Sequence, residues 1–193
     1  MNIIIFGPPG AGKGTQAKII ASNFSLNHLS SGELSRQLLD DEIIGAKVKK
    51  LLDKGELLPN TIIIDLVEKY IKSNTTAKGF IFDGYPRNIG QAKSLDIFNK
   101  KEKLKLDLII NLKLSEKESL KRILIRGKSS GRDDDNLATI KNRLLVYKER
   151  TAPILNYYKE QGKLKNLDGR ESIEEVAKKI NLLIKAELKK QLS

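Results

Sequence analysis

Residues 1–15, MNIIIFGPPGAGKGT, decide the fold that we expect of this chain. The apolar run of residues 3–6 predicts a buried strand, which stops at a loop rich in Gly and Pro, and a helical pattern begins directly after that loop. A strand, a glycine loop and a helix in this order form a phosphate-binding loop, where backbone N–H groups and the helix N-terminus surround phosphate. Lys13 adds a mobile positive charge for the outer phosphates. The alternative is an ordinary turn, but the spacing of Gly7, Gly10 and Gly12 before the Lys favours phosphate binding.

The loop departs from the common motif at Gly14, where most phosphate loops have a Ser or Thr that binds Mg²⁺. We therefore expect a magnesium ion that accompanies a nucleotide to be held in another way, through water or through Thr15.

The composition of the 193 residues, 39% of them hydrophobic, is typical of one globular domain with a substantial core. The absence of Cys excludes disulfides and thiolate zinc sites. Met1 leads into a strand without a basic segment, and no apolar run approaches the length of a membrane span. We expect a cytoplasmic protein with no membrane partner.

The net charge of +12 raises the alternative of a nucleic-acid-binding protein. The lysines are, however, scattered over helical segments with glutamates between them, and only 5% of the residues are aromatic, which disfavours a base-stacking surface. We therefore expect no nucleic-acid partner and interpret most of the lysines as a solvated surface.

Apolar runs alternate with helical patterns, which predicts an α/β fold with a five-stranded parallel sheet flanked by helices. We expect strands at residues 2–6, 27–29, 79–82, 106–112 and 163–166, and helices near 15–23, 31–39, 42–54, 61–73, 88–99, 115–126, 136–161 and 172–190. Residues 30–58 predict helices without a strand partner and hence a helical flap. Residues 127–135 predict a short lid, with a plain helix–helix connector as the alternative. The core then comprises residues 1–29, 59–126 and 136–193 of a single domain.

Arginines stand at positions where phosphates could be gripped by their planar guanidinium groups. Phosphoryl transfer mainly requires in-line positioning and cations around the transferred group. The candidates, at the ends of strands or beside the flap and lid, are Arg36, Arg87, Arg122, Arg126, Arg132 and Arg143. Asp83 follows an apolar strand and could hold the water shell of Mg²⁺, or simply cap a helix.

Six segments together resemble the adenylate kinases of the nucleoside monophosphate kinase family, over nearly the full length of the chain. They are GPPGAGKGTQ (7–16), SSGELSR (30–36), DGYPRNIGQA (83–92), RILIRG (122–127), SGRDDDN (130–136) and TAPILNYY (151–158). The resemblance implies a P-loop fold with an AMP-binding flap (30–58) and a lid of the short type (127–135), which leaves no room for a structural zinc site.

The resemblance also implies residue roles. Residues that bind ATP would be Gly10, Ala11, Gly12, Lys13, Gly14, Thr15, Arg122, Arg126 and Glu171, the last through the backbone of the turn at 169–171. Residues that bind AMP would be Ser31, Arg36, Glu56, Leu57, Leu58, Gly84, Tyr85, Pro86, Arg87, Gln91, Arg132 and Arg143. Catalytic charge would come from Lys13, Arg87, Arg122, Arg126, Arg132 and Arg143, and Asp134 and Asp135 would help to fix the closed lid.

The implied activity is reversible, Mg²⁺-dependent phosphoryl transfer, ATP + AMP = 2 ADP, by a monomer whose flap and lid close to exclude water. The AMP phosphate, with a second pKa of about 6, needs no general base, and we interpret His28 as structural. Gln91 and the hydroxyl of Ser31 favour AMP, since pyrimidine-specific relatives tend to have Asn and Ala there.

Three alternatives remain open: a UMP or CMP kinase, a nucleic-acid-binding P-loop module and a catalytically silent relative. The last is disfavoured because the chain has every phosphate-gripping residue that the resemblance leads us to expect.

Overall fold

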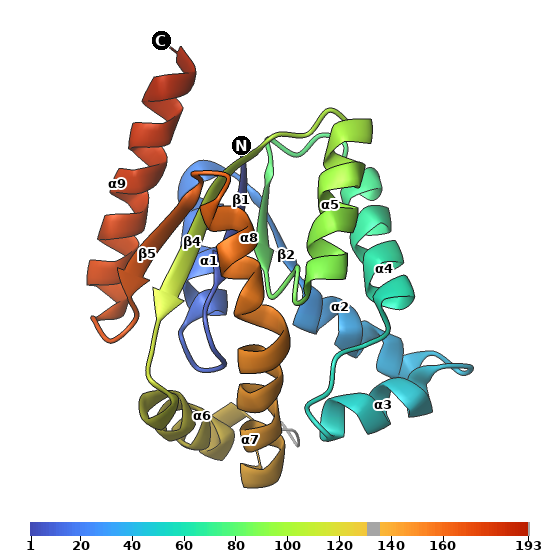
Figure 1. Cartoon of the computed structure of the whole chain (residues 1–193). Helices are drawn as coiled ribbons and strands as arrows, with labels where there is room; N and C mark the ends of the chain where they lie inside the picture. The colour runs from blue at the N-terminus through green and yellow to red at the C-terminus, as the bar shows by residue number, and fades with distance from the viewer. Residues whose placement is uncertain (131–135, 193) are drawn as a thin grey trace.

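A five-stranded parallel sheet with the strand order β2-β3-β1-β4-β5 forms the centre of the protein (Figure 1). The computed structural model describes residues 1–130 and 136–192, so the predicted lid residues Arg132, Asp134 and Asp135 lie outside the described residues. The strands are β1 (Asn2–Phe6), β2 (Asn27–Ser30), β3 (Phe80–Asp83), β4 (Leu106–Lys113) and β5 (Leu164–Asp168). Each agrees with the expected strand to within two residues at either end, and the predicted α/β fold is confirmed.

The α-helices of the described residues surround this sheet. They are α1 (Lys13–Phe24), α2 (Ser31–Gln37), α3 (Gly45–Asp53), α4 (Asn60–Ser73), α5 (Ile89–Lys101), α6 (Glu116–Ser130), α7 (Leu137–Val146), α8 (Pro153–Lys159) and α9 (Ile173–Leu192). Among these helices, none combines the length and the apolar character needed to cross a bilayer.

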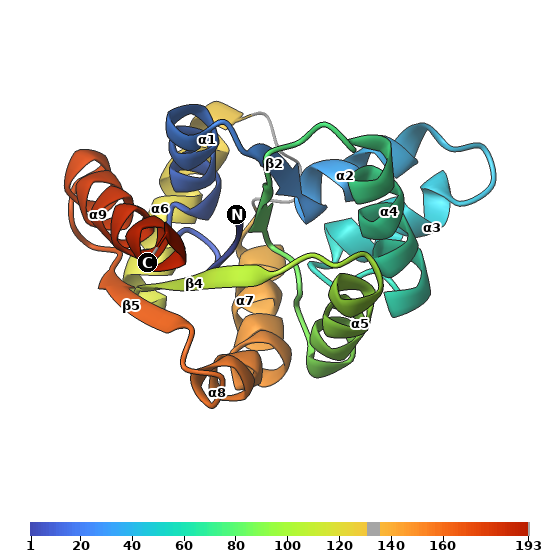
Figure 2. The same ribbon diagram turned by 90° about the horizontal axis from the view of Figure 1, so that it is seen from above.

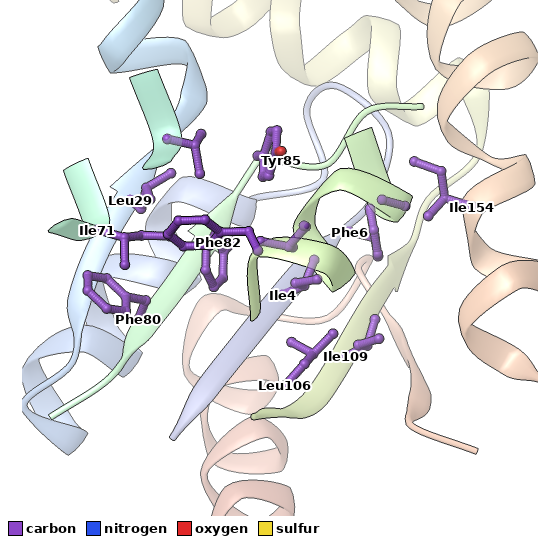
Figure 3. Packing of buried hydrophobic residues seen from close by; sticks show 14 of the residues in the cluster. Ile4, Phe6, Leu29, Ile71, Phe80, Phe82, Tyr85, Leu106, Ile109 and Ile154 are labelled. Atoms are coloured by element: carbon purple, nitrogen blue, oxygen red, sulfur yellow. The ribbon is translucent and has the colours of Figure 1, made fainter. Parts of the chain in front are cut away.

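Side chains of β1 alternate between two cores, one on each face of the sheet. Ile3 and Ile5 pack with α1 and α9, whereas Ile4 and Phe6 pack with α4, α5 and α8. Figure 2 shows these helices on opposite sides of the sheet, and Figure 3 shows the second cluster around Phe82. All five residues of β1 are buried, as a central parallel strand requires.

Two expected helices differ from the structure in where they end or in whether they are continuous. Helix α6 continues to Ser130, so the first four residues of the predicted lid (127–130) belong to a helix. The helix expected at 136–161 is interrupted by a π-helical turn, Tyr147–Thr151, before α8 begins at Pro153. Proline has no N–H and its ring crowds the preceding helical turn. The chain accommodates this with a wider turn in which the Ala152 N–H donates to the Tyr147 carbonyl.

The segment between β2 and α4 carries α2 and α3 and contributes no strand to the sheet beyond Ser30. Helix α3 begins three residues later than expected, because the Asp41 carboxylate accepts hydrogen bonds from the N–H groups of Ile43 and Ile44 and forms a turn there. In Figure 1, α2, α3, α6 and α7 lie beyond the carboxyl ends of the strands. Ligands bind at this edge of open parallel sheets.

Candidate active site

A cavity of about 740 Å³ lies at the carboxyl ends of β1, β2 and β3. Its size is that of a small-molecule site. Most of the predicted site residues line it: Gly10, Gly12, Lys13, Gly14, Thr15, Ser31, Arg36, Glu56, Leu57, Leu58, Asp83, Gly84, Pro86, Arg87, Gln91, Arg122, Arg126 and Arg143. The fold thus brings the phosphate loop, the flap and five of the six candidate arginines to one place.

The phosphate loop connects β1 to α1 with two left-handed glycines. Gly12, φ +84°, is the N-cap of α1, and a side chain there would be strained although space is free. Gly10, φ +83°, packs against α6, and a Cβ atom on it would lie 2.9 Å from the Ser119 carbonyl oxygen. Gly10 thus lets the loop approach α6 closely, and the left-handed glycines give the loop the curled backbone that is typical of anion-binding loops.

Lys13 folds back over this loop. Its Nζ donates hydrogen bonds to the carbonyl oxygens of Gly7 (2.8 Å) and Pro8 (3.0 Å). Burial lowers the pKa of Lys13 from 10.5 to about 8; Asp83 partly opposes this and Arg87 and Arg126 add to it. The charged form of Lys13 is therefore disfavoured in this protein without ligand, and the negative charge of a bound polyphosphate would oppose that effect.

Asp83, at the end of β3, faces both Lys13 and His28. The His28 Nε2 lies 3.4 Å from the Asp83 Oδ2. Burial raises the pKa of Asp83, but His28 and the charges of Lys13 and Arg87 outweigh burial, so the pKa lies below its ordinary value. A Cβ atom on Gly14 would be 3.2 Å from the Asp83 Oδ2, which gives a physical reason for the missing Ser or Thr: the carboxylate occupies that space.

Ser31, Gly84 and Arg87 form a hydrogen-bonded group across the cavity from the phosphate loop. The Gly84 carbonyl accepts from the Ser31 Oγ (2.5 Å) and the Arg87 Nε (2.6 Å), and the Arg87 Nη2 donates to the Ser31 Oγ (3.2 Å). Burial lowers the pKa of the Arg87 guanidinium; Asp83 opposes this shift and Arg36 adds to it. Arginine keeps its proton regardless, so a partly buried cation, fixed by these hydrogen bonds, lines the cavity.

Gln91 lies at the start of α5 and is 2% exposed. Its Oε1 accepts from the Arg87 backbone N–H (2.7 Å), which fixes the carbonyl side of the amide. The NH₂ side of the amide donates to the side chain of Asn60. The sequence did not single out Asn60, because this residue comes close to Gln91 only in the folded chain.

Arg122 reaches from α6 to the turn after β5. Its Nη1 donates to the Gly169 carbonyl oxygen (2.8 Å), and its Nε donates to Glu118 (3.1 Å). Arg143 comes from α7, beside Gly55 of the expected flap. The Thr139 Oγ1 donates to the Asp53 carbonyl oxygen (2.5 Å), so the end of α3 is bonded to α7.

Of the predicted site residues that the structure describes, three do not line the cavity. The side chain of Tyr85 is buried in the hydrophobic core, and that of Ala11, in the phosphate loop, is buried in the core on the α1 and α9 side of the sheet. Glu171 pairs with Lys179 outside the cavity, which leaves only a backbone role at this turn. Conversely, His28 lines the cavity although its residue type alone indicated only a structural role.

No group of three or more His, Cys, Asp or Glu side chains that could hold a metal ion occurs within residues 1–130 and 136–192. Among the carboxylates that line the cavity, Asp83 lies beside Gly14 of the phosphate loop.

The fold and the cavity define a P-loop kinase of nucleoside monophosphates. The sequence model of the family described as "Adenylate kinase" matches residues 5–163. The chain is 43% identical to an adenylate kinase of Parabacteroides distasonis, covering 91% of this chain and 93% of the relative. It is 43% identical to one of Caulobacter sp. strain K31 (94% and 96% covered), and 41% identical to adenylate kinase 1 of Synechocystis sp. strain PCC 6803 (95% and 96% covered). The chain belongs to the adenylate kinase family, and the resemblance identified from its motifs is confirmed.

Proposed function

We propose that the protein catalyses Mg²⁺-dependent, reversible phosphoryl transfer, ATP + AMP = 2 ADP. The observation that carries the proposal is one cavity with a phosphate loop on one side and the Ser31–Gly84–Arg87 group on the other. Lys13 and Arg87 both lie close enough to Asp83 for the charge of this carboxylate to raise the pKa of each. A donor and an acceptor phosphate bound at these two places would meet near Lys13.

In the proposed reaction, an oxygen of the AMP phosphate attacks the γ-phosphorus of ATP in line. The bond from this phosphorus to the β–γ bridging oxygen breaks, and that oxygen keeps the electron pair as ADP leaves. The attacking oxygen belongs to a dianion, whose second pKa is about 6, so no side chain needs to take a proton. Lys13 and the cavity arginines stabilise the charge on the transferred group.

The donor side is proposed to use the phosphate loop for the ATP phosphates, with Arg122 and Arg126 beside them and the backbone of the turn at 169–171 against the adenine. The bond from Arg122 to the Gly169 carbonyl supports the pairing of this arginine with that turn. Arg143 is proposed to contact the phosphates of both substrates from α7.

The acceptor side is proposed to hold AMP between the flap and the segment 84–91. Arg36 and Arg87 would bind its phosphate, while Ser31, Gln91 and the backbone of residues 56–58 would surround the nucleoside. Movement of the flap over AMP, and of a lid at 127–135, stays a prediction.

A magnesium ion fits the residues present. Mg²⁺ usually binds one or two carboxylates together with phosphate oxygens and water. Asp83 is such a carboxylate: it lines the cavity, its pKa is lowered, and it lies against Gly14 of the phosphate loop. We propose that Asp83 holds the ion through its water shell. The ion would neutralise phosphate charge, while orientation and exclusion of water are supplied by the protein.

A coupled assay with ATP and AMP, GMP, UMP or CMP tests the proposal. We expect the highest kcat/KM with AMP, and conversion of ADP alone into ATP and AMP. A preference for UMP or CMP would contradict the AMP assignment, and retention on RNA without any kinase activity would contradict the whole proposal. We also propose a monomer, which light scattering checks against the chain mass of 21.6 kDa.

A further inference from the structure

We infer that Asn60 is a positioning residue for base selection, because it fixes the orientation of the Gln91 amide. The inference rests on the proposed function, in which Gln91 contacts the base of the acceptor nucleotide. Asn60 is the first residue of α4, which lies beside α5 in Figure 1, and it has no place in the roles proposed above.

The bonds around Gln91 leave it one orientation. Its Oε1 accepts from the Arg87 N–H (2.7 Å), and its Nε2 donates to the Asn60 Oδ1 (3.0 Å). Rotating the amide by a half-turn would direct an NH₂ group at the Arg87 N–H and an oxygen at the Asn60 oxygen. Both contacts would then be repulsive.

Asn60 is itself held in one orientation by Asn88, the N-cap of α5. The Asn60 Oδ1 accepts from the Asn88 Nδ2 (2.8 Å) as well as from Gln91, so both of its lone pairs are used. In return, the Asn60 Nδ2 faces the Asn88 Oδ1 at 3.4 Å. The Asn88 Oδ1 also accepts from the backbone N–H of Gln91 (3.0 Å), and Asn88 thereby caps the start of the helix that carries this residue.

The neighbouring Gly90 leaves space for this pair of amides. A Cβ atom on Gly90 would lie 3.0 Å from the Asn60 Nδ2 and 3.2 Å from the Asn88 Oδ1. Since Gly is unfavourable inside a helix, its presence at the start of α5 is consistent with a need for room at this contact.

The consequence is a fixed order of donor and acceptor at the base. After its bonds to Arg87 and Asn60, the Gln91 amide retains one N–H and one lone pair. A 6-aminopurine presents an amine beside a ring nitrogen acceptor, whereas a 6-oxopurine presents an acceptor beside a ring N–H, the reverse order. A Gln91 amide that cannot rotate by a half-turn therefore pairs with the 6-aminopurine and not with the 6-oxopurine, because the mismatched base leaves buried polar groups unpaired.

The test compares Asn60→Leu with Asn60→Asp, with Thr61→Ala as the matched control at the next, exposed position of α4. Leu is similar in size but cannot accept a hydrogen bond, whereas Asp keeps an acceptor for both Gln91 and Asn88. We expect Asn60→Leu to raise KM for AMP and lower the AMP-to-GMP ratio of kcat/KM, each by about fivefold, the worth of one hydrogen bond. We expect kcat at saturating AMP and KM for ATP to change by less than about twofold, since neither depends on this amide.

Asn60→Asp and Thr61→Ala should keep the wild-type AMP-to-GMP ratio of kcat/KM. All variants are assayed at a temperature at which thermal melts show that they are folded. An unchanged ratio in Asn60→Leu, or an equal loss in Asn60→Asp, would overturn the inference. The wild-type substrate panel separates this from the proposed function. If the wild type prefers UMP or CMP, the AMP assignment fails, while the Leu-to-Asp comparison on the preferred nucleotide still decides the role of Asn60.

Discussion

Replacing Lys13 by Met is expected to abolish turnover and, at the same time, to stabilise the protein without ligand. Burial lowers the pKa of Lys13 from 10.5 to about 8, so the folded protein disfavours the charged ammonium group. Met has a side chain of similar length and no charge to desolvate. The charge of Lys13 thus lowers the free energy of unfolding of the protein without ligand.

The magnitude follows from the two pKa values. The penalty on the charged form is fully present below about pH 8 and fades as the pH rises towards the unfolded value of 10.5. At about 1.4 kcal/mol per pKa unit, it is about 3 kcal/mol near pH 7 and about 1 kcal/mol near pH 10. The variant also loses the hydrogen bonds to Gly7 and Pro8, at about 1 kcal/mol each. The net gain near pH 7 is then about 1 kcal/mol, and it should fall by about 2 kcal/mol near pH 10.

Urea unfolding of wild type and Lys13→Met at the two pH values measures this difference, and a coupled assay measures turnover. Lys93→Met, on the exposed side of α5, is the control for a lysine replaced without burial. If wild type and Lys13→Met differ in free energy of unfolding by the same amount at both pH values, the argument from burial is refuted. Near-normal kcat in the variant would instead refute the proposed catalytic role of Lys13.

Three further substitutions test separate parts of the cavity. Gly84→Ala should raise KM for AMP at least about tenfold and leave KM for ATP unchanged, because its Cβ atom would lie 2.8 Å from the Ser31 Oγ at a φ of +73°; steady-state kinetics with each substrate varied checks this. Arg122→Ala should raise KM for ATP and not KM for AMP, since its guanidinium group is bonded to the Gly169 carbonyl, and should lower kcat as well, since it is one of the arginines proposed to stabilise the transferred group. Asp83→Asn should lower kcat by about a hundredfold and raise the Mg²⁺ concentration needed; it should also shift the alkaline limb of the pH profile to lower pH, because Asp83 raises the pKa of Lys13.

The centre of the sheet could be predicted because its three central strands, β3, β1 and β4, are nearly continuous apolar runs. Residues 3–6 and 106–112 are buried on both faces of a parallel sheet, so these strands can be recognised from an unbroken apolar run, without an alternation of polar and apolar residues. Parallel strands also end at one edge, so residues that follow different strands, such as Asp83 and the phosphate loop, could be expected to meet there.

The parts that the sequence did not predict depend on contacts between distant segments. Nothing local indicates that α6 continues through Gly127 to Ser130. The interruption of the helix expected at 136–161 is different, because Pro153 is a local signal against one unbroken helix. Which side of the turn Tyr85 faces is decided by the hydrophobic core, and its side chain lies in that core rather than in the cavity. The bond from Gln91 to Asn60 joins two residues 31 positions apart, which no local pattern connects.

The cavity shows why substrate binding and folding should be strongly linked in this protein. Burial disfavours the charged forms of both Lys13 and Arg87, and the Asp83 carboxylate offsets only part of that cost. Polyphosphates supply the missing negative charge, so each nucleotide should relieve a penalty that the free protein carries. A ligand at a hundred times its Kd stabilises a fold by about 2.7 kcal/mol, a contribution comparable to the cost of burying Lys13. Several lysines of the helical surfaces instead form exposed i,i+4 pairs with acidic residues. We therefore expect the partly buried cations of the cavity, which are only a small part of the net charge of +12, to link stability to substrate binding.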